Sequence, residues 1–225
     1  YIHTANPSGR TNDPQQFTIA ISGGSLPKLL AAGVIGDNVD PSVASIDWKN
    51  WHVFFVDERF VPLDHDDSNF KACQDKLFSK VPIPASQVYT INPNAANVEA
   101  AADAYKEKLV HMFGTSCLLP ETPPVFDLVL LGMGPDGHTA SLFPCSAQIE
   151  AGLDVNSPAM LIATQPTTAP HQRMSFTLRA LVSSANVFLH LTGQKKRDVL
   201  QDALENYTDL EKPIKAVCDK TNVEL

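Results

Sequence analysis

The sequence predicts an α/β fold: a mostly parallel, doubly wound sheet with helices on both faces. Short apolar runs alternate along the chain with amphipathic stretches, a pattern typical of strands that are connected by crossover helices. Of the 225 residues, 44 % are hydrophobic and 19 % are charged, so a packed core is expected and disorder is not. The proline-rich breaks read as long loops and not as linkers, so we expect one domain over residues 1–225.

Two strands and two helices are expected in the first third of the chain. Residues 17–21 (FTIAI) and 51–56 (WHVFFV) are apolar runs cut off by polar residues, as buried strands are. Residues 26–33 (LPKLLAAG) follow the first strand as a helix. Residues 67–80 place three apolar side chains on one helical face, which predicts a second helix.

The remaining elements follow the same alternation. Asn97 is a suitable cap for a helix whose apolar residues recur at helical spacing from 98 to 112. Residues 126–131 (FDLVLL) predict a third clear strand, and residues 187–191 (VFLHL) predict a fourth, with a helix behind it at 194–204. Weaker strand patterns occupy residues 160–164 and 174–178.

Polar or glycine-rich residues follow four of the expected strands at the point where each one ends. These segments are Ser22–Ser25, Asp57–Arg59, Gly132–His138 and Thr192–Lys196. In open α/β sheets, ligands bind outside the carboxyl ends of the strands. If these strands are parallel neighbours, all four segments meet at one edge of the sheet, and we expect the functional site there.

The loop at residues 132–138 (GMGPDGH) formally matches the glycine pattern of dinucleotide-binding loops. That interpretation requires an acidic residue at the end of the next strand. Glu150 and Asp154 are at about the right distance, but they lie in a stretch without a strand pattern. A dinucleotide site is therefore disfavoured.

The same loop is better explained by the histidine that ends it. Its glycines allow tight backbone turns, and Asp136 is placed to orient the imidazole of His138. We expect residues 139–141 to open a helix whose free amides face an anion. A histidine that merely caps a turn would not explain the density of glycines around it.

Basic and glycine-rich segments at the other strand ends suit an anionic ligand. The turn Ser22–Ser25 offers amides and hydroxyls to a phosphate or a sugar, although an ordinary turn would also explain it. Arg59 is able to clamp a phosphate or a carboxylate, unless it only solvates a strand end. Lys196 lies in a basic run at a helix N-terminus, where cations oppose the helix dipole unless an anion is bound. The role of Arg173 is less defined by pattern.

Composition excludes several other classes of function. The net charge of −8 argues against nucleic acid and anionic membranes as partners. No run approaches eighteen apolar residues, and no signal peptide is recognisable. None of the four cysteines forms a C-x-x-C pair, and no cluster has zinc-site spacing, which favours free thiols in a reducing cytoplasm and no metal.

Six segments together carry a resemblance to a known family. SGGSLPKLL, FFVDERFVPLDHDDSN, VPIPASQVYTINP, FDLVLLGMGPDGHTASLFP, RMSFTL and LTGQKKRDVL occur in the order seen in 6-phosphogluconolactonases. The chain resembles that family from about residue 17 to about residue 222. The related glucosamine-6-phosphate deaminases share the Asp-Gly-His, but they continue Ile-Ala-Phe-Asn-Glu-Pro and carry Asp-Glu-Tyr where this chain has Asp57-Glu58-Arg59.

The resemblance implies a fold similar to that of the deaminases and hydrolysis of 6-phosphogluconolactone to 6-phosphogluconate, in the oxidative pentose phosphate pathway, without a cofactor. His138 matches the general base, and the basic positions near the phosphosugar match Arg59, Arg173 and Lys196. The resulting candidate catalytic residues are His138, Asp136 and Arg59. The candidate substrate-binding residues are Ser22, Gly23, Gly24, Ser25, Asp57, Gly134, Gly137, Arg173 and Lys196. Family members also have a helix before the first strand and a strand and helix at the end, which this chain is expected to lack.

Two alternatives to the lactonase remain: an isomerase–deaminase of the same fold, and a non-catalytic module that binds sugar phosphates. A covalent acyl-enzyme on Ser22, Ser25 or Ser141 is disfavoured, because none lies in a G-x-S-x-G elbow. The donors to the oxyanion are left open between the loop amides near Gly134–Gly137 and Arg59.

Overall fold

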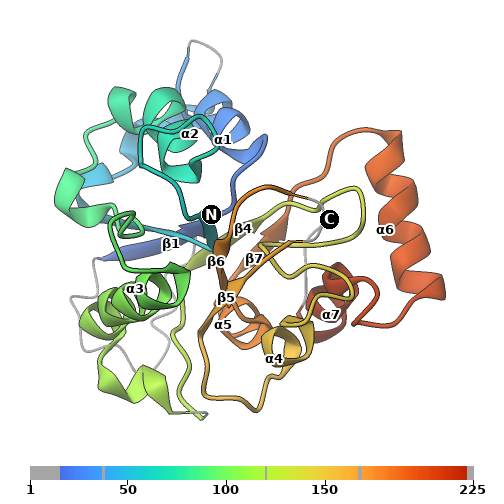
Figure 1. Ribbon diagram of the computed structural model, residues 1–225. Coiled ribbons are helices and arrows are strands. Elements are labelled where there is room, and N and C mark those ends of the chain that lie inside the picture. The colour runs from blue at the N-terminus through green and yellow to red at the C-terminus, as the bar shows by residue number, and fades with distance from the viewer. Residues whose placement is uncertain (1–15, 37–38, 120, 167–168, 222–225) are drawn as a thin grey trace.

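A four-stranded parallel sheet runs through the centre of the molecule (Figure 1). The structure is a computed structural model, and it describes residues 16–36, 39–119, 121–166 and 169–221. The strand order is β2 (Trp51–Phe55), β1 (Phe17–Ile21), β4 (Leu128–Leu131) and β7 (Val187–Leu189), with every neighbouring pair parallel. All four strands are those that the sequence indicates most clearly, so the expectation of a mostly parallel sheet is confirmed.

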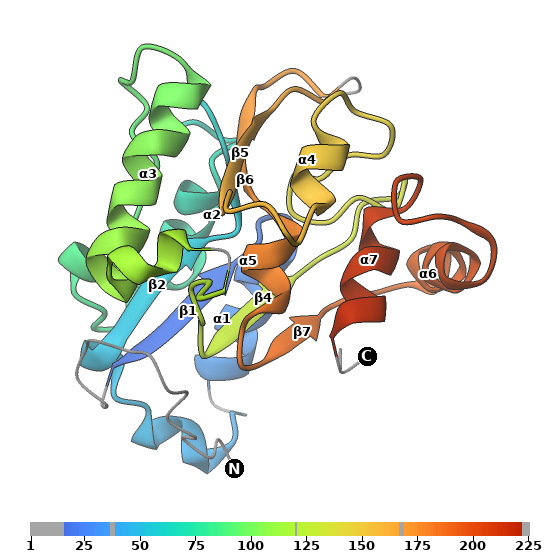
Figure 2. The same ribbon diagram turned by 90° about the horizontal axis from the view of Figure 1, so that it is seen from below.

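Helices cover both faces of this sheet, as expected. Helices α1 (Leu26–Val34) and α2 (Asn69–Lys76) lie on one face, and α3 (Val98–Phe113), α5 (Leu178–Val182) and α7 (Pro213–Lys220) lie on the other (Figures 1 and 2). Helix α6 (Gln194–Asn206) flanks the β7 edge.

Alternate residues of each strand explain the two covered faces. Ile19 and Ile21 of β1 belong to the apolar cluster under α1 and α2, whereas Ala20 between them belongs to the cluster under α3, α5 and α7. Successive side chains of a strand point to opposite faces, so a strand such as β1, with apolar residues at consecutive positions 19–21, requires cover on both sides.

A second, antiparallel sheet accounts for the weaker strand patterns. Its order is β3 (Asp57–Arg59), β6 (Arg173–Phe176) and β5 (Leu161–Thr164). Residues 57–59 therefore form a strand and not the loop that the sequence indicates. Val56 is the junction: its N–H donates to Ile21 of the parallel sheet, and its carbonyl accepts from Phe176 of the antiparallel one.

Shorter elements complete the described chain. Helix α2 begins later and ends earlier than the expected 67–80, because Ser68 caps it and a 3₁₀ turn follows it. Asn97 caps α3 as expected, accepting a hydrogen bond from the Ala100 N–H at 2.8 Å. The remaining helices are α4 (Ile149–Leu153) and the 3₁₀ turns η1 (Pro41–Ser45), η2 (Trp48–Asn50), η3 (Phe78–Lys80), η4 (Ala85–Gln87) and η5 (Thr115–Leu118).

Two expectations concern the chain ends: the lack of a helix before the first strand, and the lack of a strand and helix at the end. They fall on residues 1–15 and on the segment from residue 222 onward, which lie outside the described residues, so both stay predictions.

Within the described ranges, no helix combines the length and the apolar character that crossing a bilayer requires.

The carboxylate of Glu58 joins β3 to α2. The side chain is only 1 % exposed, and its Oε1 accepts hydrogen bonds from the N–H groups of Arg59 and Asn69, each at 2.8 Å. Its Oε2 accepts from the Phe70 N–H at 2.8 Å and from the Ser68 hydroxyl at 3.2 Å. Burial raises the pKa of Glu58 to about 7, although these backbone donors oppose the rise. Glu58 therefore acts as a structural cap and not as a solvated strand end.

We predict that Glu58→Gln lowers the free energy of unfolding by about 1–3 kcal/mol, because an amide NH₂ would then face backbone donors. The folded-state pKa is raised, so the stability from Glu58 is present below about pH 4.5 and is lost as the pH rises through about 7. The difference in free energy of unfolding between the parent and Glu58→Gln should therefore shrink from pH 5 to pH 7.5. Urea unfolding at the two pH values measures this difference, with the exposed Glu107→Gln as the control. A difference that grows with pH contradicts the assignment.

Candidate active site

A pocket of about 210 Å³ opens at the carboxyl edge of the parallel sheet, where the four polar segments meet. We call it the strand-end pocket. It is lined by ten of the twelve candidate site residues: Ser22, Gly23, Gly24, Ser25, Asp57, Arg59, Gly134, His138, Arg173 and Lys196. The other two, Asp136 and Gly137, lie in the loop behind His138 and do not line it. The remaining lining residues are Leu26, Gly132, Met133, Pro135, Ala140 and His190.

The turn between β1 and α1 needs both of its glycines. A Cβ on Gly23 would lie 1.8 Å from the Asn69 Oδ1, so only glycine allows the turn to pass Asn69. Gly24 has a φ of +67°, which favours glycine. The Ser22 hydroxyl is buried and has no hydrogen-bond partner in the described part of the chain, and the Ser25 side chain makes no capping bond to α1. The turn is therefore built to offer polar groups to the pocket.

His138 is held by Asp136 in one orientation. The Nδ1 of His138 lies 2.6 Å from the Asp136 Oδ1, and the ring packs on Phe143 with 4.5 Å between ring centroids. Burial disfavours the charged Asp136, but its hydrogen bond to His138 and the charge of the imidazole outweigh burial, and the net effect lowers the pKa of Asp136. In the neutral form of the imidazole, an ionised Asp136 accepts the Nδ1–H, which leaves the Nε2 lone pair for a ligand.

The loop that carries His138 is closed by its own backbone. The Gly134 N–H donates to the His138 carbonyl at 2.8 Å, and the Gly137 N–H donates to the Gly134 carbonyl at 3.1 Å. A Cβ on Gly134 would lie 2.1 Å from the His138 ring, so this glycine leaves the space that the imidazole occupies. The glycines serve His138, as the sequence indicates.

The segment from the α6–α7 connection supports this loop from behind. The Lys212 ammonium donates to the Asp136 carbonyl at 2.8 Å, and the Ile214 N–H donates to the Gly137 carbonyl at 3.1 Å. Gly137 has a φ of +87°, and a Cβ there would lie 2.6 Å from Lys212 Cδ. No sequence motif connects Lys212 to a loop 76 residues away.

Residues 139–141 form a tight turn and not the expected start of a helix, so that expectation is wrong. Ala140 has a φ of +48°, which is outside the helical region. Hydrogen bonds from the Thr139 and Ser141 side chains hold the turn in place of the backbone hydrogen bonds of a helix. The Thr139 hydroxyl donates to the Gly132 carbonyl, and the Ser141 hydroxyl donates to the Asp57 Oδ2 at 2.6 Å. Asp57 thus ties the turn to β3.

The structure also bears on the dinucleotide interpretation of the loop at residues 132–138. That interpretation needs a strand ending at Glu150 or Asp154, but the described chain has helix α4 there.

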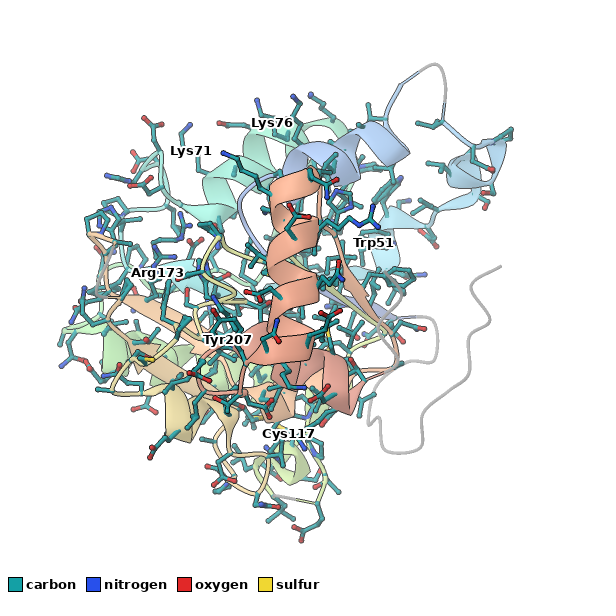
Figure 3. All side chains as sticks on the ribbon, turned by 90° about the vertical axis from the view of Figure 1, so that its right-hand side faces the viewer. Trp51, Lys71, Lys76, Cys117, Arg173 and Tyr207 are labelled. Atoms are coloured by element: carbon teal, nitrogen blue, oxygen red, sulfur yellow. The ribbon has the colours of Figure 1, made fainter. Side chains whose placement is uncertain are left out.

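Two arginines face each other across the antiparallel sheet. Arg59 of β3 and Arg173 of β6 are directly paired in the register, and both line the strand-end pocket. Arg173, which is labelled in Figure 3, is 8 % exposed. Its guanidinium lies over the Phe143 ring, 5.2 Å from the ring centroid. Burial, followed by the charge of Arg59, lowers the pKa of Arg173. The carboxylates of Asp57, Asp67 and Glu58 oppose this lowering in part, although none of them is within ion-pair distance of Arg173 in the described chain. The Nε atoms of both arginines have no hydrogen-bond partner among the described residues.

Like charges directly opposite each other destabilise a sheet unless something neutralises them. A phosphate or carboxylate in the strand-end pocket would do so, because guanidinium groups bind such oxygens in pairs. The opposed arginines are therefore the clearest sign of an anionic ligand.

Two further cationic or titratable groups reach the pocket from the β7 side. Lys196 lies in the first turn of α6, after Gly193 with a φ of +89°. His190 follows β7, where its N–H donates to the Leu131 carbonyl and its buried Nε2 has no partner in the described ranges. Sequence reasoning missed His190, because the expected strand at 187–191 hid a residue that lies just beyond the true strand end.

The fold and the pocket define an α/β protein with a histidine and several cations at the carboxyl edge of a parallel sheet. The chain belongs to the glucosamine-6-phosphate isomerase/6-phosphogluconolactonase family, whose model matches residues 5–225.

Named relatives agree with this membership. The chain is 46 % identical over 193 residues to 6-phosphogluconolactonase 3, chloroplastic, of Arabidopsis thaliana, covering 84 % of this chain but 56 % of that protein. It is 40 % identical over 191 residues to 6-phosphogluconolactonase of Rattus norvegicus, covering 85 % and 70 %. A 6-phosphogluconolactonase structure from Shewanella baltica superimposes with a TM-score of 0.74 at 35 % identity, covering 93 % of this chain and 82 % of that one.

We predict that Gly134→Ala displaces the His138 ring and lowers the free energy of unfolding by about 1–3 kcal/mol, the usual cost of forcing atoms into a packed site. The matched control is Gly33→Ala in α1, where an added Cβ meets nothing within 4 Å and helix propensity improves. Urea unfolding compares the two. Equal stabilities for the two variants would show that Gly134 is not needed to accommodate His138.

Proposed function

We propose that residues 1–225 form a lactonase domain that hydrolyses 6-phosphogluconolactone to 6-phosphogluconate, as in the oxidative pentose phosphate pathway. One observation carries the proposal: a histidine oriented by Asp136 lines the same pocket as the opposed Arg59 and Arg173. The names of the relatives support it. The chain spans little more than half of the Arabidopsis relative's length, so the activity is proposed for this part of the protein.

The phosphate end of the substrate is held by Lys196, Arg173 and the amides of the Gly23–Gly24 turn. All of them line the strand-end pocket. Arg173 is buried and its Nε has no hydrogen-bond partner in the described chain, so a dianion would supply the missing acceptor. Binding at this remote group positions the lactone carbonyl near His138.

His138 then acts as the general base. Its Nε2 takes a proton from a water molecule, whose oxygen forms a bond to the lactone carbonyl carbon. Asp136 keeps the imidazole in the required tautomer and stabilises the imidazolium that forms. The carbon–ring oxygen bond then breaks, and the imidazolium returns the proton to the ring oxygen. Water is consumed, and the acid product is released.

The oxyanion of the tetrahedral intermediate is stabilised by Arg59. The N–H groups of Gly134 and Gly137 already donate within the loop, the Asp136 N–H donates toward its own carboxylate, and Pro135 has none. The Arg59 Nη1 donates to the Asp67 carbonyl at 2.6 Å, but its Nε has no partner among the described residues. Of the two sets of donors that the sequence leaves open, the geometry therefore favours Arg59.

The alternatives fit less well. Ser141 is fully buried and donates to Asp57, so it is not an accessible nucleophile for an acyl-enzyme. Ser22 and Ser25 line the pocket, but neither lies in a G-x-S-x-G elbow. A deaminase of this fold carries a tyrosine at the position of Arg59, so no ammonia should be released from glucosamine 6-phosphate. A non-catalytic binding module would need the cations but not the His138–Asp136 pair.

The expectations for partners, cofactors and cellular location stay predictions. The partner is a small phosphosugar lactone, and neither nucleic acid nor a membrane is needed. No cofactor takes part in the steps above. A cytoplasmic location also stays a prediction, because some of the named relatives are chloroplastic and others carry no compartment in their names.

We predict that His138→Asn lowers kcat for 6-phosphogluconolactone by about 10²–10⁴-fold, the range for loss of a general base. Affinity for 6-phosphogluconate should change little, because the phosphate ligands lie elsewhere in the pocket. The assay follows acid release after subtraction of spontaneous hydrolysis, with the exposed His111→Asn as the control. Near-normal turnover by His138→Asn would remove the histidine from the mechanism.

We predict that Arg173→Met has opposite effects on binding and stability. The affinity for 6-phosphogluconate should fall about 10–150-fold, equivalent to about 1.5–3 kcal/mol for a hydrogen bond to a charged group. The ligand-free protein should gain up to about 1 kcal/mol, because the opposed charge of Arg59 is relieved. Calorimetry and urea unfolding test the two effects. A variant that loses stability and keeps its affinity contradicts the role of Arg173.

A further inference from the structure

A cluster of metal-ligand side chains lies outside the strand-end pocket. It consists of His65 and Asp67, from the segment between β3 and α2, and His171, from the segment before β6. The His171 Nε2 lies 2.8 Å from the Asp67 Oδ2, and the His65 Nδ1 lies 3.9 Å from the same oxygen. The two imidazole rings are 5.3 Å apart between centroids. None of the three residues lines the pocket.

We propose that His65, Asp67 and His171 bind a divalent transition-metal ion, with Zn²⁺ as the expected ion. Two imidazoles and one carboxylate form a donor set that such ions use, and water completes the coordination. Ligand bonds of about 2.0–2.1 Å in a tetrahedral site place ligand atoms about 3.3 Å apart. The observed 2.8 and 3.9 Å lie on either side of that value, and all three ligand atoms lie within 4.8 Å of one another, so rearrangement of these side chains alone would form the site.

Access and charge also suit a cation. The side chains of His65, Asp67 and His171 are 42 %, 52 % and 25 % exposed, so an ion reaches them from solvent. The surrounding sequence Asp64-His65-Asp66-Asp67 carries three carboxylates. Asp66 pairs with Lys71 at 3.5 Å and its side chain points largely into solvent, so it is not counted among the ligands.

Two contacts limit the affinity. The Asp67 N–H donates to the His65 Nδ1 at 3.0 Å, so His65 must release that bond or turn its ring to present Nε2. The Arg59 guanidinium donates to the Asp67 carbonyl, and its positive charge opposes a second cation nearby. We therefore expect a reversible site and not a permanently filled structural one.

A bound ion would connect the two segments that carry the opposed arginines. His171 precedes Arg173 by two residues, and Asp67 already contacts Arg59. The backbone links the same segments, because the Phe60 N–H donates to the Gln172 carbonyl at 2.9 Å. The ion would thus hold β3, the start of α2 and β6 together without entering the pocket. Spacing in the sequence did not show this cluster, since Asp67 and His171 are 104 residues apart.

The test is calorimetric titration of the whole, metal-stripped chain with ZnCl₂, in a Cys145→Ser background that removes the exposed thiol. One equivalent should bind. The double variant His65→Ala/His171→Ala should bind at least about 100-fold more weakly, and the exposed His111→Ala should bind normally. Urea unfolding of each metal-free variant verifies that it is folded.

Substitution with Co²⁺ supplies a spectroscopic readout that is independent of affinity. Visible absorption bands typical of nitrogen and oxygen ligands should appear with the parent chain and His111→Ala, and should be lost in the double variant. The proposal is overturned if the parent binds no Zn²⁺, or if the double variant binds it equally well. Both measurements are made without substrate, so they fail or succeed independently of the lactonase activity.

Discussion

The repulsion between two opposed guanidinium groups is the constraint on which the site depends. Arg59 and Arg173 face each other because β3 and β6 pair in a fixed register, and that pairing exists because the chain leaves the parallel sheet at Val56. Neighbouring carboxylates are used inside the protein: Glu58 caps α2, and Asp57 accepts from Ser141. These carboxylates offset the charge of Arg173 only in part, so positive charge stays available at the carboxyl edge of the sheet, where an anionic ligand neutralises it.

The histidine side of the site depends on close packing and not on charge. Gly134 leaves room for the His138 ring, Phe143 supports that ring, and Asp136 fixes its Nδ1. Lys212 holds the backbone of Asp136 from behind. The base is thus pre-oriented before the substrate arrives, while the arginine side stores the unfavourable charge that substrate binding relieves.

Much of this could be predicted from the sequence, because local patterns determine it. Buried parallel strands are continuous apolar runs, and the rule that ligands bind at strand ends placed residues 22–25, 57–59, 132–138 and 192–196 together. What could not be predicted depends on contacts between distant residues. The separate antiparallel sheet, the turn at residues 139–141, the support by Lys212 and the cluster at His171 all need partners far along the chain.

The proposed mechanism requires the phosphate between Arg173 and Lys196 and the reacting carbon beside His138. A crystal structure with bound 6-phosphogluconate would reveal both positions. Phosphate oxygens should lie within hydrogen-bond distance of both cations, and the product carboxylate should lie near the His138 Nε2, with one oxygen facing the Arg59 Nε. The mechanism is wrong if the product binds in the reverse direction, with its phosphate at His138, or binds outside the strand-end pocket.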